Sequence, residues 1–342
     1  MRIALDATYS LSDEPSGVAV YSREILNGSA SSGLAQAWDW FYRSQRYWRS
    51  WKQRLPRNVS RRFLSDSRGN RSAELFHGLN QRLPMKPFRK QIVTFHDLFV
   101  MTGDYSSAEF RSRFTVQAHE AASRADLIIA VSEFAARQVT DLLAIDPAGI
   151  LVIHHGTTPR DLPPLPREKI ILCVGAIQRR KNQAGLVRAF RAAPADWKLV
   201  LAGSNGFGAE QVIEEIKASP CADRVILTGY VSDAELSEWY ARASIFAFPS
   251  FDEGFGMPIL DAMAAGIPVI TGNRSALPEV AGDAAVLIDP DRDDELCEAF
   301  RALCADSFRR EEVAARGLER SKQFSWRTAV DQTLAVYREV IG

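Results

Sequence analysis

Residues 248–270 read FPSFDEGFGMPILDAMAAGIPVI, and this stretch combines a strand, a glycine turn and a helix. The apolar run that ends at Ser250 is typical of a buried strand. Gly254 and Gly256 predict a tight turn, and Pro258 suits the first turn of a helix, where its missing N–H is not needed. The order strand, turn, helix is typical of parallel α/β sheets, in which ligands bind beyond the carboxyl ends of the strands.

The same alternation of short apolar runs and helical patterns extends over the whole chain. Continuous apolar strands between helices indicate parallel sheets that are covered on both faces. A proline-rich connector at 157–168 separates two such regions, because proline at this density breaks helices and stiffens the chain. We predict strands that begin near residues 2, 91, 127 and 150 before this connector, and near residues 170, 198, 224, 245, 268 and 285 after it.

The length of 342 residues fits two domains rather than one. We therefore predict an α/β fold of two Rossmann-like, doubly wound parallel-sheet domains, 1–160 and 161–325, that face each other across a ligand-binding cleft. Residues 326–342 carry a helical apolar stripe, which can pack on the second domain or cross back to the first.

The composition is that of a globular protein, with 46% hydrophobic and 25% charged residues. Four cysteines lack the CxxC spacing of a metal site and the density of a disulfide framework, which favours a reducing compartment such as the cytoplasm. We expect no signal peptide and no membrane span. Residues 1–166 contain 21 Lys and Arg against 16 Asp and Glu, so the first half is expected to face any anionic partner.

Charged residues gather at two predicted strand ends of the second domain. Arg179, Arg180 and Lys181 follow one strand and repel each other unless an anion lies close, for which a diphosphate is suitable. Glu253 precedes the helix of the opening stretch, and Asp261 lies eight residues further on. Carboxylates at these places can bind sugar and ribose hydroxyls, while the helix start suits phosphate. The alternatives are solvated loop cations and acids that only favour the helix start.

Three segments of the second domain resemble the nucleotide-sugar domain of the family 4 retaining glycosyltransferases, which have the GT-B fold. They are 174–182 (VGAIQRRKN), 201–206 (LAGSNG) and 227–290. The overall likeness is to bacterial polysaccharide mannosyltransferases. Asp261 stands where the family has a second glutamate, and Arg179 stands where many relatives have proline.

The resemblance implies a role for each matching position. Glu253 would contact the donor sugar, Asp261 the ribose, and Arg180 and Lys181 the diphosphate. The other donor contacts that it implies are Gly254, Phe255 and Gly256 in the turn, and the backbone near Tyr230 and Val231 for the base.

Two strand ends of the first domain match the same family. Gly17 opens a helix after the first strand and matches a glycine-containing loop, which implies a donor contact. His96 lies in TFHDL, 94–98, where family members place a histidine against the donor sugar, although a lone histidine there is more often structural. His154 and His155 lie where relatives often have Pro-Asn-Gly, so we assign them no catalytic role.

Residues 38–63 contain eight Arg or Lys and one acid among tryptophan, tyrosine and phenylalanine. This mixture suits the headgroup layer of an anionic membrane or a lipid-linked acceptor. We expect such contacts from Arg46, Trp48, Arg49 and Trp51. The alternative is that amphipathic arginines cover a core. Nucleic acid is not an expected partner, because no RNA-binding motif accompanies the segment.

The resemblance implies a retaining hexosyltransferase with His96, Glu253 and Lys181 as its catalytic residues. It would move mannose from GDP-mannose to a hydroxyl of a glycan or lipid-linked saccharide in cell-surface polysaccharide synthesis, at the inner face of the cytoplasmic membrane. We expect no metal or other cofactor, because the cations and the helix start can stabilise the leaving diphosphate. Residues 289–294, DPDRDD, have the spacing of a cation-binding motif, but their acids also suit a helix start.

Three other functions stay open. One is a transferase that uses a UDP-sugar to donate glucose, galactose or N-acetylglucosamine, and another is a GT-B nucleotide-sugar epimerase, which needs no acceptor. The third is a noncatalytic scaffold descended from a transferase. A nicotinamide-dependent oxidoreductase is not expected, because no GxGxxG follows any predicted strand.

Overall fold

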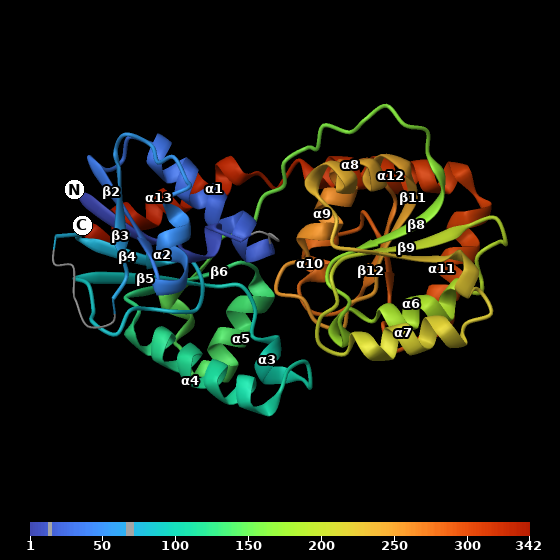
Figure 1. Cartoon of the computed structure of the whole chain (residues 1–342), viewed down its shortest axis with the longest axis horizontal. Coiled ribbons are helices and arrows are strands. Elements are labelled where there is room, and N and C mark those ends of the chain that lie inside the picture. Colours follow the sequence, from blue (N-terminus) through green and yellow to red (C-terminus); the bar gives the residue numbers. More distant parts are fainter. Residues whose placement is uncertain (13–15, 66–71) are drawn as a thin grey trace. The chain divides into compact units, whose positions relative to one another are not determined.

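The computed structural model describes residues 1–12, 16–65 and 72–342. The chain folds into two compact units, and Figure 1 shows that each of them is built from strands and helices. Unit 1 comprises Met1–Thr102, Ser107–Gly156 and Ser325–Gly342, and unit 2 comprises Gly103–Ser106 and Thr157–Phe324. Residues 158–167 contain neither a helix nor a strand.

The described part of unit 1 contains a seven-stranded parallel sheet in the order β3-β2-β1-β4-β5-β6-β7. Because all pairings are parallel, the carboxyl ends of the strands meet at one edge of the sheet. The strands are β1 (Arg2–Asp6), β2 (Ala37–Tyr42), β3 (Val59–Phe63), β4 (Leu75–Gly78), β5 (Lys90–Phe95), β6 (Leu127–Ala130) and β7 (Ile150–Val152).

Helices cover both faces of this sheet (Figure 1). Phe76 and Val93 belong to the core on the face that carries α4 and α5, whereas Trp38 and His77 contact Tyr337 of α13 on the opposite face. The helices are α1 (Gly17–Ser31), α2 (Ser44–Ser50), α3 (Phe99–Thr102), α4 (Ala108–Arg124), α5 (Glu133–Leu143) and α13 (Trp326–Ile341), with short 3-10 turns η1 (Thr8–Ser10) and η2 (Pro147–Gly149).

The C-terminal helix α13 packs closely along α1 in unit 1. A Cβ atom on Gly28 would lie only 2.6 Å from a methyl group of Val330, so the glycine permits the close approach of the two helices. The buried Tyr337 hydroxyl lies 2.6 Å from Nδ1 of His77 in β4. The last helix of the chain is therefore a structural part of the first unit.

Unit 2 contains a six-stranded parallel sheet in the order β10-β9-β8-β11-β12-β13, with helices on both faces (Figure 1). The strands are β8 (Glu168–Val174), β9 (Lys198–Ala202), β10 (Val225–Gly229), β11 (Ala243–Phe248), β12 (Val269–Gly272) and β13 (Val286–Ile288). The helices are α6 (Gln183–Phe190), α7 (Ala209–Ala218), α8 (Asp233–Arg242), α9 (Met257–Ala264), α10 (Leu277–Ala281), α11 (Asp293–Ala305) and α12 (Ser307–Ser321), with 3-10 turns η3 (Arg179–Lys181) and η4 (Ala222–Arg224).

The structure confirms the predicted α/β class, and a strand lies at each of the ten predicted positions. Strands β2, β3 and β4 were not predicted. β2 was missed because its aromatic residues were interpreted as an interfacial segment, whereas Trp38, Trp40 and Tyr42 are buried in the sheet. β4 is only four residues long, too short for a clear periodic pattern.

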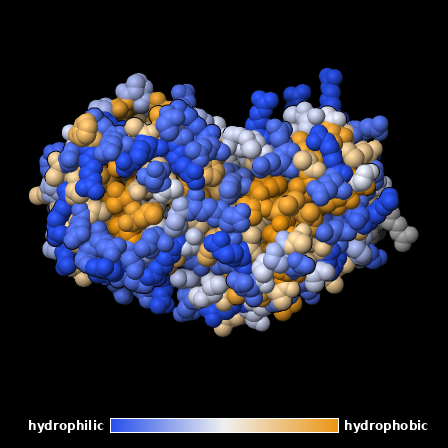
Figure 2. Space-filling view, turned by 180° about the vertical axis from the view of Figure 1, so that it is seen from behind, coloured by the Kyte–Doolittle hydropathy of each residue, from blue (hydrophilic) through white to orange (hydrophobic). Residues whose placement is uncertain are grey.

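The face of the molecule in Figure 2 is mostly hydrophilic, with patches of apolar side chains. Within residues 1–12, 16–65 and 72–342, no helix combines the length and the apolar composition that crossing a bilayer requires. The four cysteines are free thiols, and three of them are buried.

Candidate active site

The turn between β11 and α9 fixes a carboxylate at the carboxyl end of a central strand of unit 2. Gly256, the residue before α9, has a φ of 101°, and a Cβ atom there would lie 2.7 Å from Leu277. Only glycine fits this conformation without strain. The backbone N–H of Glu253 donates to the Ser275 hydroxyl at 3.0 Å, which holds the start of the turn in place.

Two cations in η3, the turn that follows the neighbouring strand β8, bind this carboxylate. Lys181 Nζ lies 2.8 Å from Oε1 of Glu253, and Arg180 Nη1 lies 2.9 Å from Oε2. The Ser250 hydroxyl donates to Oε1 at 3.1 Å, and Arg180 also donates to the Asp252 carbonyl. Because β8 and β11 are adjacent in the parallel sheet, residues 72 positions apart in the sequence meet at the same edge.

The three charged side chains of this ion triad, Arg180, Lys181 and Glu253, are almost fully buried. Burial alone raises the pKa of Glu253, but Arg180 and Lys181 outweigh it and lower the pKa to about 2. Burial also lowers the pKa of Lys181, which Glu253 opposes in part. The Lys181 ammonium lies 4.5 Å from the centre of the Phe248 ring, a cation–π contact. By contrast, the adjacent Arg179 is exposed.

The ion triad carries two positive charges and one negative charge in a buried place. The single carboxylate compensates only part of the positive charge, so an anionic group with several oxygen atoms is a suitable additional partner. A diphosphate is such a group, and its binding by Arg180 and Lys181 stays a prediction.

Asp261 lies two turns along α9 and belongs to a different polar cluster. Its Oδ1 accepts a hydrogen bond of 2.7 Å from the Thr157 hydroxyl, and its Oδ2 lies 3.6 Å from Arg160 Nη2. Burial raises the pKa of Asp261, although Arg160 and Thr157 oppose this shift. The Asp261 carboxylate, which we predict to contact the ribose, is therefore held by Thr157 and Arg160 of the segment that leads into β8.

The remaining predicted donor contacts of unit 2 differ in exposure. Tyr230 follows β10 at the same edge of the sheet and is exposed, and Val231 is partly exposed. Gly254 continues the turn after Glu253. The Phe255 side chain is buried, with its ring centre 5.9 Å from that of Phe324. A donor contact at Phe255 therefore falls to its backbone.

In unit 1, Gly17 is the exposed first residue of α1, where the Ser16 hydroxyl caps the helix by accepting from the N–H of Ala19. His96 follows β5 and is buried. Its Nε2 lies 3.0 Å from the Leu79 carbonyl oxygen, so this nitrogen carries the proton and donates. The Nδ1 of His96 is therefore an acceptor.

The ring of His155 is the hydrogen-bond partner of His96 Nδ1. Its Nε2 lies 3.3 Å from Nδ1 of His96, and the two rings stack with their centres 5.3 Å apart. Burial lowers the pKa of His96 to about 4, and burial with the neighbouring histidines places the pKa of His155 well below its usual value. Both rings are thus neutral at physiological pH. The sequence predicts no catalytic role for His155; the structure places its ring against His96, and only its place after a strand could have indicated this contact.

The basic aromatic segment 38–63 divides into a buried and an exposed part. In β2, the aromatic side chains Trp38, Trp40 and Tyr42 are themselves buried in the core. The α2 region exposes Trp48 and Trp51 by 76% and 61%, and the Arg61 guanidinium lies 4.7 Å from the centre of the Trp51 ring. Arg49 is exposed beside them, whereas Arg46 donates to the Leu11 carbonyl.

The acids of residues 289–294 form ion pairs near the start of α11, which begins at Asp293, so they lie at a helix start as their sequence context favoured. Asp289 and Asp291 lie 2.6 and 2.7 Å from the guanidinium of Arg274, and Asp293 lies 2.6 Å from that of Arg188. Across the residues that the structure describes, no group of three or more His, Cys, Asp or Glu side chains is arranged to hold a metal ion.

Comparisons with known proteins connect this geometry to a family. The family model described as "Glycosyl transferases group 1" matches residues 157–320. O-antigen chain mannosyltransferase B of Escherichia coli is 31% identical over 282 residues, which cover 77% of this chain and 74% of that protein. The chain belongs to the glycosyl transferases group 1 family.

Further relatives agree with this membership. The serotype-specific mannosyltransferase WbdA of Escherichia coli is 30% identical over 225 residues, 59% of this chain, but the match spans only 27% of that protein. Among solved structures, the sucrose-phosphate synthase of Thermosynechococcus elongatus has a TM-score of 0.81 and 21% identity, with 99% of this chain and 98% of that chain covered. This glycosyltransferase has the GT-B fold, and its likeness to bacterial polysaccharide mannosyltransferases holds.

Proposed function

We propose that this glycosyltransferase transfers mannose from GDP-mannose, with retention at the anomeric carbon, to a hydroxyl of a glycan or lipid-linked saccharide in cell-surface polysaccharide synthesis. The observation that carries the proposal is the buried ion triad at the carboxyl ends of β8 and β11. The choice of mannose is supported by the likeness to the O-antigen chain mannosyltransferase, whose alignment covers 77% of this chain at 31% identity.

Donor binding exchanges the partners within the triad. In the absence of a ligand, Glu253 compensates the charges of Arg180 and Lys181. When the diphosphate arrives, its oxygens take over both cations, and the carboxylate becomes available to accept hydrogen bonds from sugar hydroxyls. Because its pKa is about 2, Glu253 stays ionised throughout the physiological range and acts as an acceptor.

The reaction needs stabilisation of the departing diphosphate more than it needs a strong base. The bond between the anomeric carbon and the diphosphate oxygen breaks, and the acceptor oxygen forms its bond to that carbon on the same face. The acceptor proton passes to the diphosphate, which is the nearest base on that face. Arg180 and Lys181 stabilise the developing charge as preorganised cations, so the reaction proceeds without a metal or other cofactor.

The enzyme acts in the cytoplasm, at the inner face of the membrane. Free, largely buried thiols suit a reducing compartment. The exposed Trp48 and Trp51, with Arg49 and Arg61 beside them, suit the headgroup layer of an anionic bilayer.

Product analysis with four donors tests the proposal. GDP-mannose, UDP-glucose, UDP-galactose and UDP-N-acetylglucosamine are each incubated with EDTA and a lipid-linked saccharide. We expect acceptor-dependent transfer of α-linked mannose from GDP-mannose alone. Transfer from a UDP-sugar only would show that GDP-mannose is not the donor. Release of sugar without an acceptor would favour an epimerase. Loss of activity with EDTA would contradict a metal-independent reaction. If the protein bound none of the four sugar nucleotides, the result would indicate a noncatalytic scaffold.

A further inference from the structure

A second concentration of cations lies in unit 1, around a pocket of about 620 Å³ whose lining includes no residue of the ion triad. The pocket lies at the carboxyl edge of the sheet, since its residues follow four adjacent strands. Thr8 and Tyr9 follow β1, Arg43 follows β2, Ser65 follows β3 and Arg82 follows β4. This edge is where parallel α/β sheets bind ligands.

The lining of this pocket combines guanidinium groups with hydroxyl groups. Its described residues include three arginines and no carboxylate. The hydroxyl side chains are those of Thr8, Tyr9, Ser12, Ser16, Ser44 and Ser65. Guanidinium forks and hydroxyl donors are the groups that bind phosphoryl oxygens.

The three arginines differ in how their charge is compensated. Arg43 Nε lies 3.6 Å from Oδ2 of Asp6, a fully buried carboxylate at the end of β1. Arg46 donates to the Leu11 carbonyl, which does not neutralise a charge. Neither Arg46 nor Arg82 forms an ion pair with a carboxylate of the described residues. The described lining of the pocket therefore has an excess of positive charge that a bound anion can compensate.

An aromatic patch continues from the rim of this pocket. Phe63 lines the pocket, and its ring centre lies 5.3 Å from that of Tyr47. Tyr47 in turn contacts the exposed Trp48 and Trp51, with centres 5.5 and 6.4 Å away. Exposed rings beside a cationic pocket suit a ligand in which the anion is attached to a larger saccharide or lipid.

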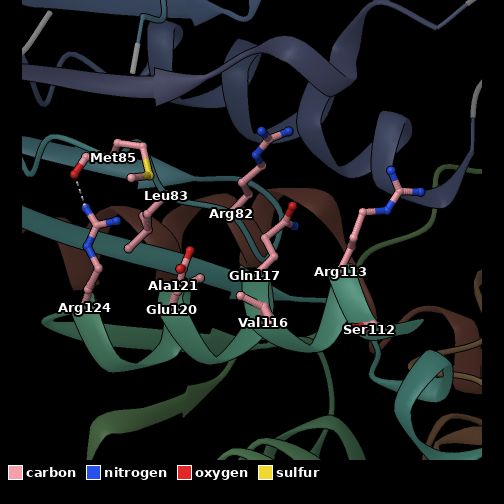
Figure 3. Close-up of a pocket in the computed structure, with 10 residues that line it drawn as sticks. All are labelled: Arg82, Leu83, Met85, Ser112, Arg113, Val116, Gln117, Glu120, Ala121 and Arg124. Atoms are coloured by element: carbon pink, nitrogen blue, oxygen red, sulfur yellow. Dashed lines mark hydrogen bonds between the residues drawn. The ribbon is translucent and has the colours of Figure 1, made fainter. Parts of the chain in front are cut away.

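A hollow along α4 provides a comparison within the same unit (Figure 3). It also contains arginines, but Arg124 donates to the carbonyls of Pro84 and Met85, and Glu120 contributes a carboxylate to the lining. Arg113 lies on its rim (Figure 3). Both hollows contain arginines. The pocket of Arg43, Arg46 and Arg82 differs from the hollow along α4 because its described lining contains no carboxylate.

We infer that the pocket of Arg43, Arg46 and Arg82 binds a phosphoryl group of the acceptor, so that the acceptor is a phosphorylated saccharide rather than a neutral one. The inference rests on the proposed transferase function, because it specifies the acceptor of that reaction. The phosphoryl group can belong to a soluble sugar phosphate or to the phosphate of a lipid carrier.

Two binding arms distinguish these sources. With GDP present in excess to occupy the donor site, mannose 6-phosphate is titrated against mannose, and binding to phosphatidylcholine vesicles is measured with and without phosphatidic acid. The variants are Arg46→Gln with Arg82→Gln, and Arg82→Gln alone, which keeps the Arg46 bond to Leu11. Arg113→Gln serves as the matched control on α4.

We expect the double variant to lose phosphate-dependent binding by about ten-fold or more in at least one arm, since each hydrogen bond to a charged group is worth about ten-fold in affinity. Arg82→Gln should lose a smaller part, and Arg113→Gln should bind like the wild type. A loss in the soluble arm identifies a sugar phosphate, and a loss in the vesicle arm identifies a lipid phosphate. Unchanged binding in both arms, or an equal loss in Arg113→Gln, would overturn the inference.

Titration with GDP separates this inference from the proposed function. If the proposed function fails, the wild type does not bind GDP, whatever the pocket of unit 1 does. If only the inference fails, GDP binds normally and the arginine variants behave like the wild type in both phosphate arms.

Discussion

The two cationic sites of this glycosyltransferase differ in how their positive charges are compensated. In unit 2, Arg180 and Lys181 share the buried carboxylate of Glu253 at 2.9 and 2.8 Å. In unit 1, Arg46 and Arg82 line a pocket whose described lining contributes hydroxyl groups and no carboxylate. A site with an internal counter-ion keeps its cations in place before the ligand arrives, and the ligand must displace that counter-ion. Among the described residues, neither Arg46 nor Arg82 has a carboxylate that a ligand must displace.

The largest expected effect follows from removing the internal counter-ion. Glu253→Gln leaves two buried cations uncompensated, which should lower the free energy of unfolding by about 3–5 kcal/mol. A nucleoside diphosphate should restore more stability to this variant than to the wild type, because it supplies the missing negative charge. Thermal unfolding with and without GDP measures both effects. Equal stabilisation of the two proteins by GDP would contradict the exchange of partners.

Removing one cation from the triad should have the next largest effect. Lys181→Ala should reduce turnover by about 100-fold, as for other preorganised charge contacts to a transition state. Arg179→Ala is the matched control, since Arg179 is adjacent in sequence but exposed. Steady-state kinetics of the two variants test the comparison. Similar losses in both, or a normal rate for Lys181→Ala, would remove Lys181 from the mechanism.

The two units should also differ in their response to acid. His96 has a pKa of about 4 in the folded chain, below its usual 6.5, so the unfolded state binds protons first and stability falls as the pH drops from 6.5 through 4. For this one histidine, the loss is about 1 kcal/mol at about pH 5.5. Glu253 has a depressed pKa of about 2 against 4.5, so its contribution is complete above pH 4.5 and is lost only as the pH falls toward 2.

Hydrogen exchange of the two sheets between about pH 7 and pH 5 measures this difference, after correction for the intrinsic exchange rate. We expect the protection of β5 to fall in this range while that of β11 does not. His155→Gln removes one buried titrating ring and should reduce the slope in unit 1. A parallel decline of both sheets would show that the histidines do not control the acid response.

The smallest expected effect concerns the exposed rings of α2. Replacing Trp48 and Trp51 by serine should weaken binding to anionic vesicles a few-fold, because each exposed ring contributes only a partly buried apolar surface. Replacing the exposed Phe308 of α12 by serine is a control of similar exposure in unit 2. Vesicle sedimentation compares the Trp48 and Trp51 variant with the Phe308 variant and the wild type. The rate of donor hydrolysis should be the same in all three proteins. Unaltered sedimentation of the Trp48 and Trp51 variant would argue for a purely structural segment.

Unit 2 could be predicted from the sequence more completely than unit 1. Its strands are continuous apolar runs, and its charged residues follow the strands directly, so the place of Glu253 and Lys181 at one sheet edge was predictable. Their direct pairing was not, because the same charges also suit a ligand. In unit 1, arginines follow the aromatic strand β2 directly, so the sequence favours an interface there rather than a buried strand. Arg43 and Arg82 come from separate strand ends without a shared motif, so only the fold brings them together.

A crystal structure of the protein with bound GDP-mannose and EDTA tests the central claim most directly. The account predicts that the diphosphate contacts Arg180 and Lys181, and that the Glu253 carboxylate has left both cations and accepts hydrogen bonds from the sugar. A structure in which Glu253 still pairs with both cations while the diphosphate binds elsewhere would contradict it.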